Sequence, residues 1–284
     1  MPTQGHASDP GAEWRFPNRA TPPGSSAYYS VRLAPAGLRD DLAAVLAWRD
    51  RVRAVLNEVS DAGVALTKLQ WWREELERTY AGEARHPLSR ALAQALARHS
   101  LPSEGFLRMA AQVQTELTGQ QPADRAGLEG ACEADLGALF ELVTRCHGGS
   151  EPGPLATARA LGAFCAQVYL IRDSGLHLRR GRGFLPADRL AQLGLTHLAL
   201  RDQRERLAAL LAEAAGAALA YRKANGIGPD LSLDLPVSLR VRARILAALL
   251  AELEAEGFDL AERRVGLTPV RKLWLAWREA RRRV

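Results

Sequence analysis

The sequence contains few cysteines, with three in a chain of 284 residues. Cys132, Cys146 and Cys165 are widely spaced and include no C-x-x-C pair. This spacing disfavours a disulfide framework or a zinc site and is typical of a reducing compartment. We therefore expect a cytoplasmic protein without a structural metal.

Aromatic residues are also scarce, at 6% of the chain, and β-branched residues are infrequent beside alanine, leucine and arginine. Such a composition favours helix nearly throughout. No segment shows the alternation of apolar and polar residues that is typical of a strand. The sequence therefore predicts an all-α fold.

No apolar run approaches the roughly 18 residues that span a bilayer. The first residues carry acids and prolines rather than an apolar core, so a signal or transit peptide is not expected. The net charge of +6 allows an anionic membrane or a nucleic acid as partner. Because the basic residues are scattered without interleaved aromatics, we expect no nucleic-acid partner.

Residues 1–24 hold five prolines and three glycines, which predicts a flexible N-terminal segment before a domain over residues 25–284. Apolar residues then recur at helical spacing in a series of segments. We expect helices over 37–59, 64–81, 87–97, two within 103–147, then 187–195, 197–224, 237–256 and 267–283.

The stretch over residues 162–186 begins as an apolar helix and ends in a basic loop punctuated by glycine. Arg172 and Asp173 stand at its polar end, and His177 follows Asp173 by one helical turn on the same face. The loop adds Arg179, Arg180 and Arg182. Two interpretations remain open: Asp173 and its neighbours share a ligand, or Asp173 pairs with Arg172 or Arg179 at a solvated helix end.

Several segments resemble motifs of the squalene and phytoene synthase family. The family's second aspartate-rich motif reads Q-x-x-N-I-L-R-D-x-x-E-D-x-x-x-G-R-x-Y-L-P, and this chain keeps Arg172-Asp173, Gly181-Arg182 and Phe184-Leu185-Pro186. The opening GSSAYYSVRLAP, which contains Tyr28, and the later KLQWWREEL are also similar to family segments. The resemblance covers roughly residues 25–278 and implies a single-domain, isoprenoid-synthase-type helical bundle around a central cavity.

The aspartates that define the family's motifs are largely replaced. At the first motif the chain has Arg53, Ala54 and Asn57, and at the second His177 replaces an aspartate, so that Asp173 remains alone of five. In active members these carboxylates hold magnesium ions, which bind the substrate diphosphate. A cation at Arg53 opposes metal binding, and Asp50 can pair with it at i, i+3.

Two functions from different classes follow from the resemblance. In the first, the chain is a non-catalytic prenyl- or lipid-binding or respiratory-complex assembly protein, like the degenerate branch that includes the mitochondrial complex I assembly factor. In the second, it is a magnesium-dependent prenyl transferase with atypical ligands. The first predicts no cofactor, and only the second requires magnesium.

Without a metal, arginines would meet the phosphate of a prenyl phosphate or phospholipid directly. A solvated basic face is the alternative. The candidate ligand-binding residues are Arg53, Arg172, Asp173, Arg179, Arg180, Arg182 and Tyr28, and Asn57 and His177 are residual motif positions. The adjacent Glu74 and Glu75 resemble a catalytic pair, but pairing with Arg73 or Arg78 along the helix explains them.

The last helix, from Pro269, is basic and carries Leu273, Trp274 and Trp277. Its charges are Arg271, Lys272, Arg278, Arg281, Arg282 and Arg283 against the single acid Glu279. Either this helix rests on a membrane or a membrane-protein complex, which would place the protein at the periphery of the inner membrane, or the three apolar side chains pack back on the bundle.

Overall fold

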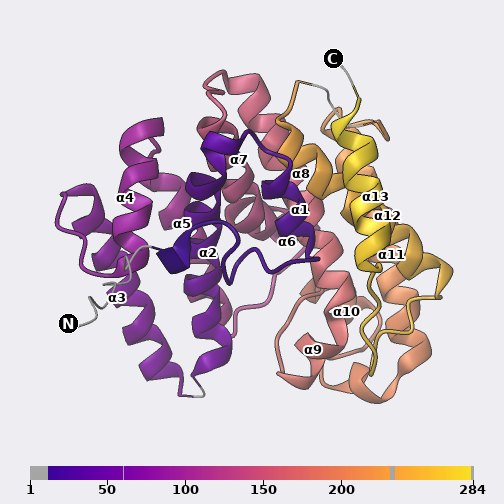
Figure 1. The fold of residues 1–284 in the computed structure, drawn as a ribbon. Helices are drawn as coiled ribbons and strands as arrows, with labels where there is room; N and C mark the ends of the chain where they lie inside the picture. The colour runs from indigo at the N-terminus through magenta and orange to yellow at the C-terminus, as the bar shows by residue number, and fades with distance from the viewer. Residues whose placement is uncertain (1–11, 60, 231–233, 283–284) are drawn as a thin grey trace, which may run out of the picture.

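The computed structural model describes residues 12–59, 61–230 and 234–282 and shows one all-helical domain (Figure 1). Its α-helices are α1 (Ser26–Arg32), α2 (Arg39–Glu58), α3 (Ala62–Tyr80), α4 (Pro87–His99), α5 (Ser103–Leu117), α6 (Arg125–Cys132), α7 (Ala138–Cys146), α8 (Pro152–Arg172), α9 (Ser174–Arg179), α10 (Ala187–Gln192), α11 (Arg204–Ala224), α12 (Val237–Ala255) and α13 (Pro269–Ala280). Short 3₁₀ turns are η1 (Ala12–Trp14), η2 (Ala36–Leu38) and η4 (Ala199–Asp202), and the π-helical turn η3 (Glu133–Gly137) joins α6 to α7. The described residues contain no strand, and the predicted all-α class is confirmed.

Helix boundaries follow capping chemistry that the sequence contains. Asp61, Asp124 and Thr268 accept hydrogen bonds from the first-turn amides of α3, α6 and α13, which otherwise lack partners. A proline occupies the first turn of α4, α8 and α13. The predicted long helix over 197–224 is divided into η4 and α11, because Gln203 takes a non-helical backbone conformation.

Helix α8 lies at the centre, where α7, η3, α11 and α12 pack against it. Figure 1 shows α2–α5 on one side of the bundle and α9–α13 on the other. By length and composition α8 is apolar enough to cross a membrane, which corrects the prediction that no segment approaches this length. Within the fold it is a core helix, because 67% of its most apolar stretch of 18 residues is buried.

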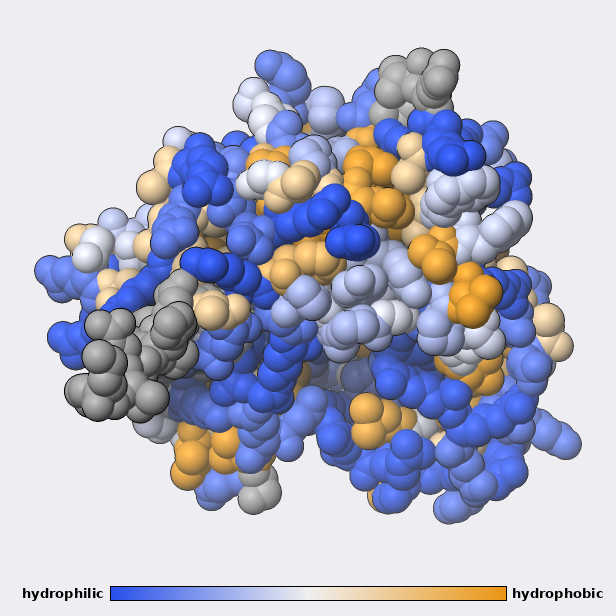
Figure 2. All heavy atoms as spheres, viewed as in Figure 1, coloured by the Kyte–Doolittle hydropathy of each residue, from blue (hydrophilic) through white to orange (hydrophobic). Residues whose placement is uncertain are grey.

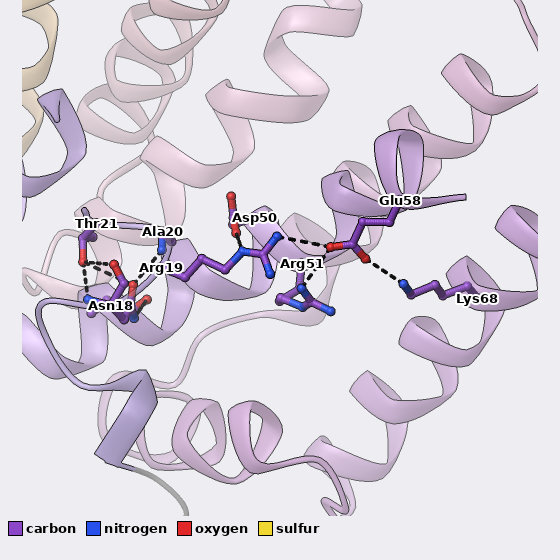
Figure 3. A network of polar contacts seen from close by, with 9 residues as sticks. Asn18, Arg19, Ala20, Thr21, Asp50, Arg51, Glu58 and Lys68 are labelled. Atoms are coloured by element: carbon purple, nitrogen blue, oxygen red, sulfur yellow. Dashed lines mark hydrogen bonds and ion pairs between the residues drawn. The ribbon is translucent and has the colours of Figure 1, made fainter. Parts of the chain in front are cut away.

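Residues 12–24 pack on the domain. The Asn18 amide donates to the carbonyls of Trp14 and Ala43 at 2.8 and 3.1 Å, which ties this segment to α2. Figure 3 shows Arg19 extending from it toward Asp50 and Glu58 on the same helix. Of the segment over residues 1–24 that was predicted to be flexible, residues 12–24 thus contact α2 through Asn18 and Arg19, and residues 1–11 lie outside the described part.

Two glycines allow α8 and η3 to approach closely. A Cβ on Gly162 would lie 2.4 Å from the Leu136 carbonyl oxygen, and one on Gly137 would lie 2.8 Å from the Arg159 carbonyl oxygen. Real Cβ atoms do not approach oxygen so closely, so larger residues would push the two elements apart. The close contact fixes η3, which carries Asp135.

The pair Glu74 and Glu75 is structural, as predicted from helical pairing. The Glu75 carboxylate is buried and accepts the backbone amides of Arg85 and His86, both at 2.7 Å, and Nε of Arg78 at 2.9 Å. Glu74 is exposed and lies 3.9 Å from Arg78. Glu75 therefore anchors the turn between α3 and α4.

Candidate functional site

A cavity of about 1160 Å³ lies between the two sides of the bundle. Figure 2 shows a recess between these sides in the lower middle of the view. Apolar side chains from α2, α7 and α12 form part of the wall; they include Leu46, Leu139, Ile245, Leu246 and Leu249. The cavity can thus accept an apolar chain as well as a polar group.

Charged side chains of the cavity wall are predominantly cationic. Nine are basic, namely Arg19, Arg49, Arg53, Arg172, Arg180, Arg182, Arg242, Arg264 and Lys272. Four are carboxylates, namely Asp50, Glu116, Asp135 and Asp173, which leaves an excess of five positive charges. A concave, partly apolar surface with this excess attracts anions.

Arg53 of α2 is held by carboxylates from two other elements. Its Nη1 and Nη2 donate to Glu116 at 3.0 and 3.1 Å, and Nη1 lies 3.1 Å from Asp135. Arg49, one turn earlier, binds both oxygens of Asp135 at 2.7 and 2.6 Å. The predicted pair of Arg53 with Asp50 is wrong, because Glu116 offers Arg53 a bidentate contact inside the cavity and Asp135 adds a third contact.

These contacts determine the charge states of the cluster Arg49–Arg53–Glu116–Asp135. Burial disfavours the charged form of Arg53, but the attraction of Asp135 and Glu116 outweighs it and raises the pKa of Arg53. Burial also opposes ionisation of Asp135, yet Arg49 and Arg53 hold its pKa below the usual range. Arg53 and Asp135 are therefore both charged at neutral pH.

Asp173, the remaining motif aspartate, lies between two arginines. Arg172 donates to it through Nε and Nη2 at 2.9 and 2.5 Å, and Nε of Arg264 donates at 2.7 Å. Burial opposes its ionisation, but the bonds and charges of Arg172 and Arg264 lower its pKa overall. Of the predicted partners Arg172 is confirmed, whereas Arg179 donates to the Ala261 carbonyl at 3.0 Å.

The basic loop after α9 reaches across to the C-terminal end of α2. Arg180 donates to the Asn57 side-chain oxygen, and Arg182 donates to the Leu56 carbonyl. Both partners are neutral, so neither interaction cancels the arginine's charge. His177 is partly buried; burial, together with the charges of Arg53 and Arg182, lowers its pKa to about 4, which keeps it neutral at pH 7.

The polar residues of the wall that sequence reasoning missed include Arg49, Glu116, Asp135 and Arg264, described above, and also Tyr169, Arg242 and Lys272. The guanidinium carbons of Arg172 and Arg242 lie 4.5 and 5.8 Å from the Tyr169 ring centre. Burial opposes ionisation of Tyr169, but Arg242 and Arg172 lower its pKa. Arg242 was recognisable as a cation placed at helical spacing from Ile245, Leu246 and Leu249, because such a face is otherwise expected to be core.

The structure brings most of the predicted site residues together. Those that line the cavity are Arg53, Arg172, Asp173, His177, Arg180 and Arg182. Tyr28, Asn57 and Arg179 are not part of its lining. Tyr28 instead stacks on Phe16, with ring centres 5.3 Å apart, so it supports the N-terminal segment.

The cavity wall does not fit a cluster of magnesium ions. Among residues 12–59, 61–230 and 234–282, no group of three His, Cys, Asp or Glu side chains is arranged to hold a metal ion. Glu116, Asp135 and Asp173 each have both oxygens bound to arginine. Magnesium requires free oxygen ligands in near-octahedral geometry, and these carboxylates are not free.

Comparisons with other proteins agree with the observed fold. Residues 20–271 match the model of the squalene/phytoene synthase family. Phytoene synthase of Arthrospira platensis is 27% identical over 182 residues, which cover 60% of this chain and 59% of that protein. The mouse protein named NADH dehydrogenase (ubiquinone) complex I, assembly factor 6, is 24% identical over 170 residues, which cover 60% of this chain and 51% of that protein. The chain thus spans between one half and three fifths of the length of these curated relatives.

Among solved structures, a crystal structure of a dehydrosqualene synthase in complex with ligand superposes with a TM-score of 0.77. It covers 89% of this chain and 90% of the other, at 19% sequence identity. At that identity the likeness concerns the fold alone, and it confirms the predicted helical bundle around a central cavity.

Proposed function

This chain belongs to the squalene/phytoene synthase family, and we propose that it binds a lipid phosphate in its cavity without magnesium and does not condense prenyl diphosphates. The ligand class is an anionic head group on an apolar chain, such as a prenyl phosphate or a phospholipid. The observation that carries this proposal is the pairing of Glu116, Asp135 and Asp173 with arginines of the same cavity wall.

The arginine pairs oppose metal binding in two ways. A bidentate arginine–carboxylate pair is among the stronger polar contacts in proteins, so a metal would first have to displace it. Arg53 also repels a divalent ion, at a cost on the order of 1–4 kcal/mol for each unit of charge at about 4 Å. Both terms act against the three-metal chemistry of active relatives, for which five aspartates would be needed.

The surplus cations supply the contacts that a phosphate requires. Arg180 and Arg182 bind only neutral oxygens, and Nε of the buried Arg242 has no partner within the described part of the chain. An arginine grips a phosphate through two parallel donors, so a phosphate gives each of these groups a stronger partner than it has now. The apolar wall along α12 then accommodates the hydrocarbon chain.

A non-catalytic role in assembling another protein complex would explain why the family fold is retained while its motif aspartates are replaced. The similarity to complex I assembly factor 6 supports a non-catalytic assembly function, which we propose is carried out in the cytoplasm, peripheral to the inner membrane. The alternative is a magnesium-dependent prenyl transferase with atypical ligands. The similarity to phytoene synthases supports it, and it requires that Asp173 exchange its arginines for metal.

Binding measured in EDTA tests the proposal. Geranylgeranyl monophosphate and a short-chain phosphatidic acid are titrated into the protein and into the variant Arg180→Ala/Arg182→Ala. Loss of two charge-assisted contacts is expected to weaken binding at least about tenfold. Arg179→Ala is the matched control, because Arg179 ends α9 directly before the loop and is absent from the cavity wall. Binding that needs magnesium, or that the double variant retains in full, would contradict the proposal.

A further inference from the structure

We propose that the outer face of α13 is a docking surface for an anionic lipid bilayer. This α13 face consists of Val270, Leu273, Trp274 and Trp277, flanked by Arg278 and Arg281. The four apolar side chains are 77, 53, 51 and 48% exposed, in that order. An exposed cluster of this kind is typical of an interaction site rather than of an ordinary solvated helix.

The contacts of α13 with the rest of the domain keep its apolar face exposed. Positions 270, 273, 274 and 277 follow the i, i+3, i+4, i+7 pattern and therefore share one face. On the opposite side Ala276 is fully buried, and the buried Glu279 carboxylate binds Arg240 and Arg244 at 3.3 and 3.0 Å. These contacts set the rotation of α13, so its tryptophans cannot turn inward. The prediction that Leu273, Trp274 and Trp277 pack back on the bundle is wrong.

The charges around this face are complementary to lipid phosphates. The guanidinium of Arg278 lies 5.3 Å from the Trp274 ring centre, and that of Arg281 lies 4.0 Å from the Trp277 ring centre. The single acid of the helix, Glu279, points inward. Tryptophan combines an apolar ring with a polar N–H and prefers the head-group level of a bilayer, where neighbouring arginines meet phosphates. Arg283, also counted as basic in the sequence, lies outside the described residues.

The same helix also reaches the cavity. Lys272 lines the cavity and donates to the Gly24 carbonyl at 3.2 Å, on a different side of α13 from the tryptophans. In Figure 2 apolar residues interrupt the blue surface on the side of the molecule where Figure 1 places α12 and α13. Docking therefore brings the cavity wall close to the membrane, although the docking itself does not depend on what the cavity binds.

Co-sedimentation of the full chain with vesicles tests this surface. Phosphatidylcholine vesicles are compared with vesicles that also contain phosphatidylglycerol, at low and at high salt. We expect binding to the anionic vesicles, weakened by salt, and at least about tenfold weaker for Trp274→Ser/Trp277→Ser. Arg278→Gln/Arg281→Gln is expected to lower affinity roughly fivefold per arginine.

The matched control is Val64→Ser/Leu198→Ser, which removes two exposed apolar side chains from other parts of the surface. It is expected to bind vesicles as the unaltered protein does. Thermal unfolding of every variant shows whether the fold is retained, and quenching of tryptophan fluorescence by brominated lipid gives a second readout of insertion. Absence of vesicle binding at low salt, or equal binding by the tryptophan double variant, would overturn the proposal and leave a protein partner for this face.

Discussion

Replacement of Arg53 by methionine is expected to destabilise the protein, because it leaves the Glu116 carboxylate inside the cavity without its arginine partner. Removing one partner of a buried ion pair costs about 3–5 kcal/mol. Arg53 and Glu116 are 23 and 22% exposed, and Asp135 keeps Arg49 as a partner, so we expect the lower end, about 3 kcal/mol. For a chain of this size that corresponds to a fall in the midpoint of thermal unfolding of roughly 6–12 °C.

A double-mutant cycle separates the pair from the bulk of the side chain. The free energies of unfolding in urea are measured for Arg53→Met, Glu116→Gln and the double variant. We expect a coupling energy above about 1 kcal/mol, since residues in one ion-pair network are not additive. The matched control is the cycle on Arg189 and Glu213, whose side chains are 38 and 50% exposed and bond at 2.9 Å. This surface pair is expected to couple by less than about 1 kcal/mol. Equal coupling in the two cycles would refute the reasoning that Arg53 is locked into the cavity.

Three further predictions concern other parts of the fold. Burial lowers the pKa of His177 from 6.5 to about 4, so the unfolded chain binds this proton more readily and the free energy of unfolding falls as the pH drops from 6.5 toward 4. In urea titrations at several pH values, the free energy of unfolding of His177→Gln should fall by on the order of 1–3 kcal/mol less over that range than that of the unaltered protein. An unchanged pH profile in the variant would contradict this. Gly162→Ala places a Cβ 2.4 Å from the Leu136 carbonyl oxygen and should lower the free energy of unfolding by about 2 kcal/mol or more. In Gly216→Ala the added Cβ meets no atom within 4 Å, so this control should not be destabilised. Similar unfolding midpoints for the two variants would count against the close contact of α8 and η3. Glu75→Ala should lower the free energy of unfolding by about 3 kcal/mol, because two backbone amides and Arg78 lose their acceptor. Glu74→Ala should lower it by less than about 1 kcal/mol, because Glu74 is exposed. Comparable effects of the two variants would show that Glu75 does not anchor the turn between α3 and α4.

The fold was predictable from the sequence because its signals are local. Apolar spacing and capping residues such as Asp61 and Thr268 fix where helices form, and the family resemblance supplied the cavity. The helix ends of α2, α3 and α12 fall within two residues of the predicted limits. The packing of residues 12–24 was not foreseen, because proline and glycine mark irregular backbone without indicating whether its polar groups find partners.

The partners of the cavity arginines were not predictable in the same way. Arg53 and Glu116 are 63 positions apart, and Asp135 enters the site through a π-helical turn whose spacing breaks the ordinary helical pattern. A local rule therefore assigned Arg53 to Asp50. The orientation of the C-terminal helix was not predictable either. An amphipathic pattern indicates which residues share a face but not whether that face meets the core or the solvent.

The release of pyrophosphate from farnesyl and geranylgeranyl diphosphate, measured with magnesium and with EDTA in the same preparation, is the most direct test of whether the cavity lacks prenyl transferase activity. Because Glu116, Asp135 and Asp173 are bound to arginine, we expect no release above the blank in either condition. Magnesium-dependent release that Asp173→Ala abolishes would contradict the account and establish an active prenyl transferase with atypical ligands.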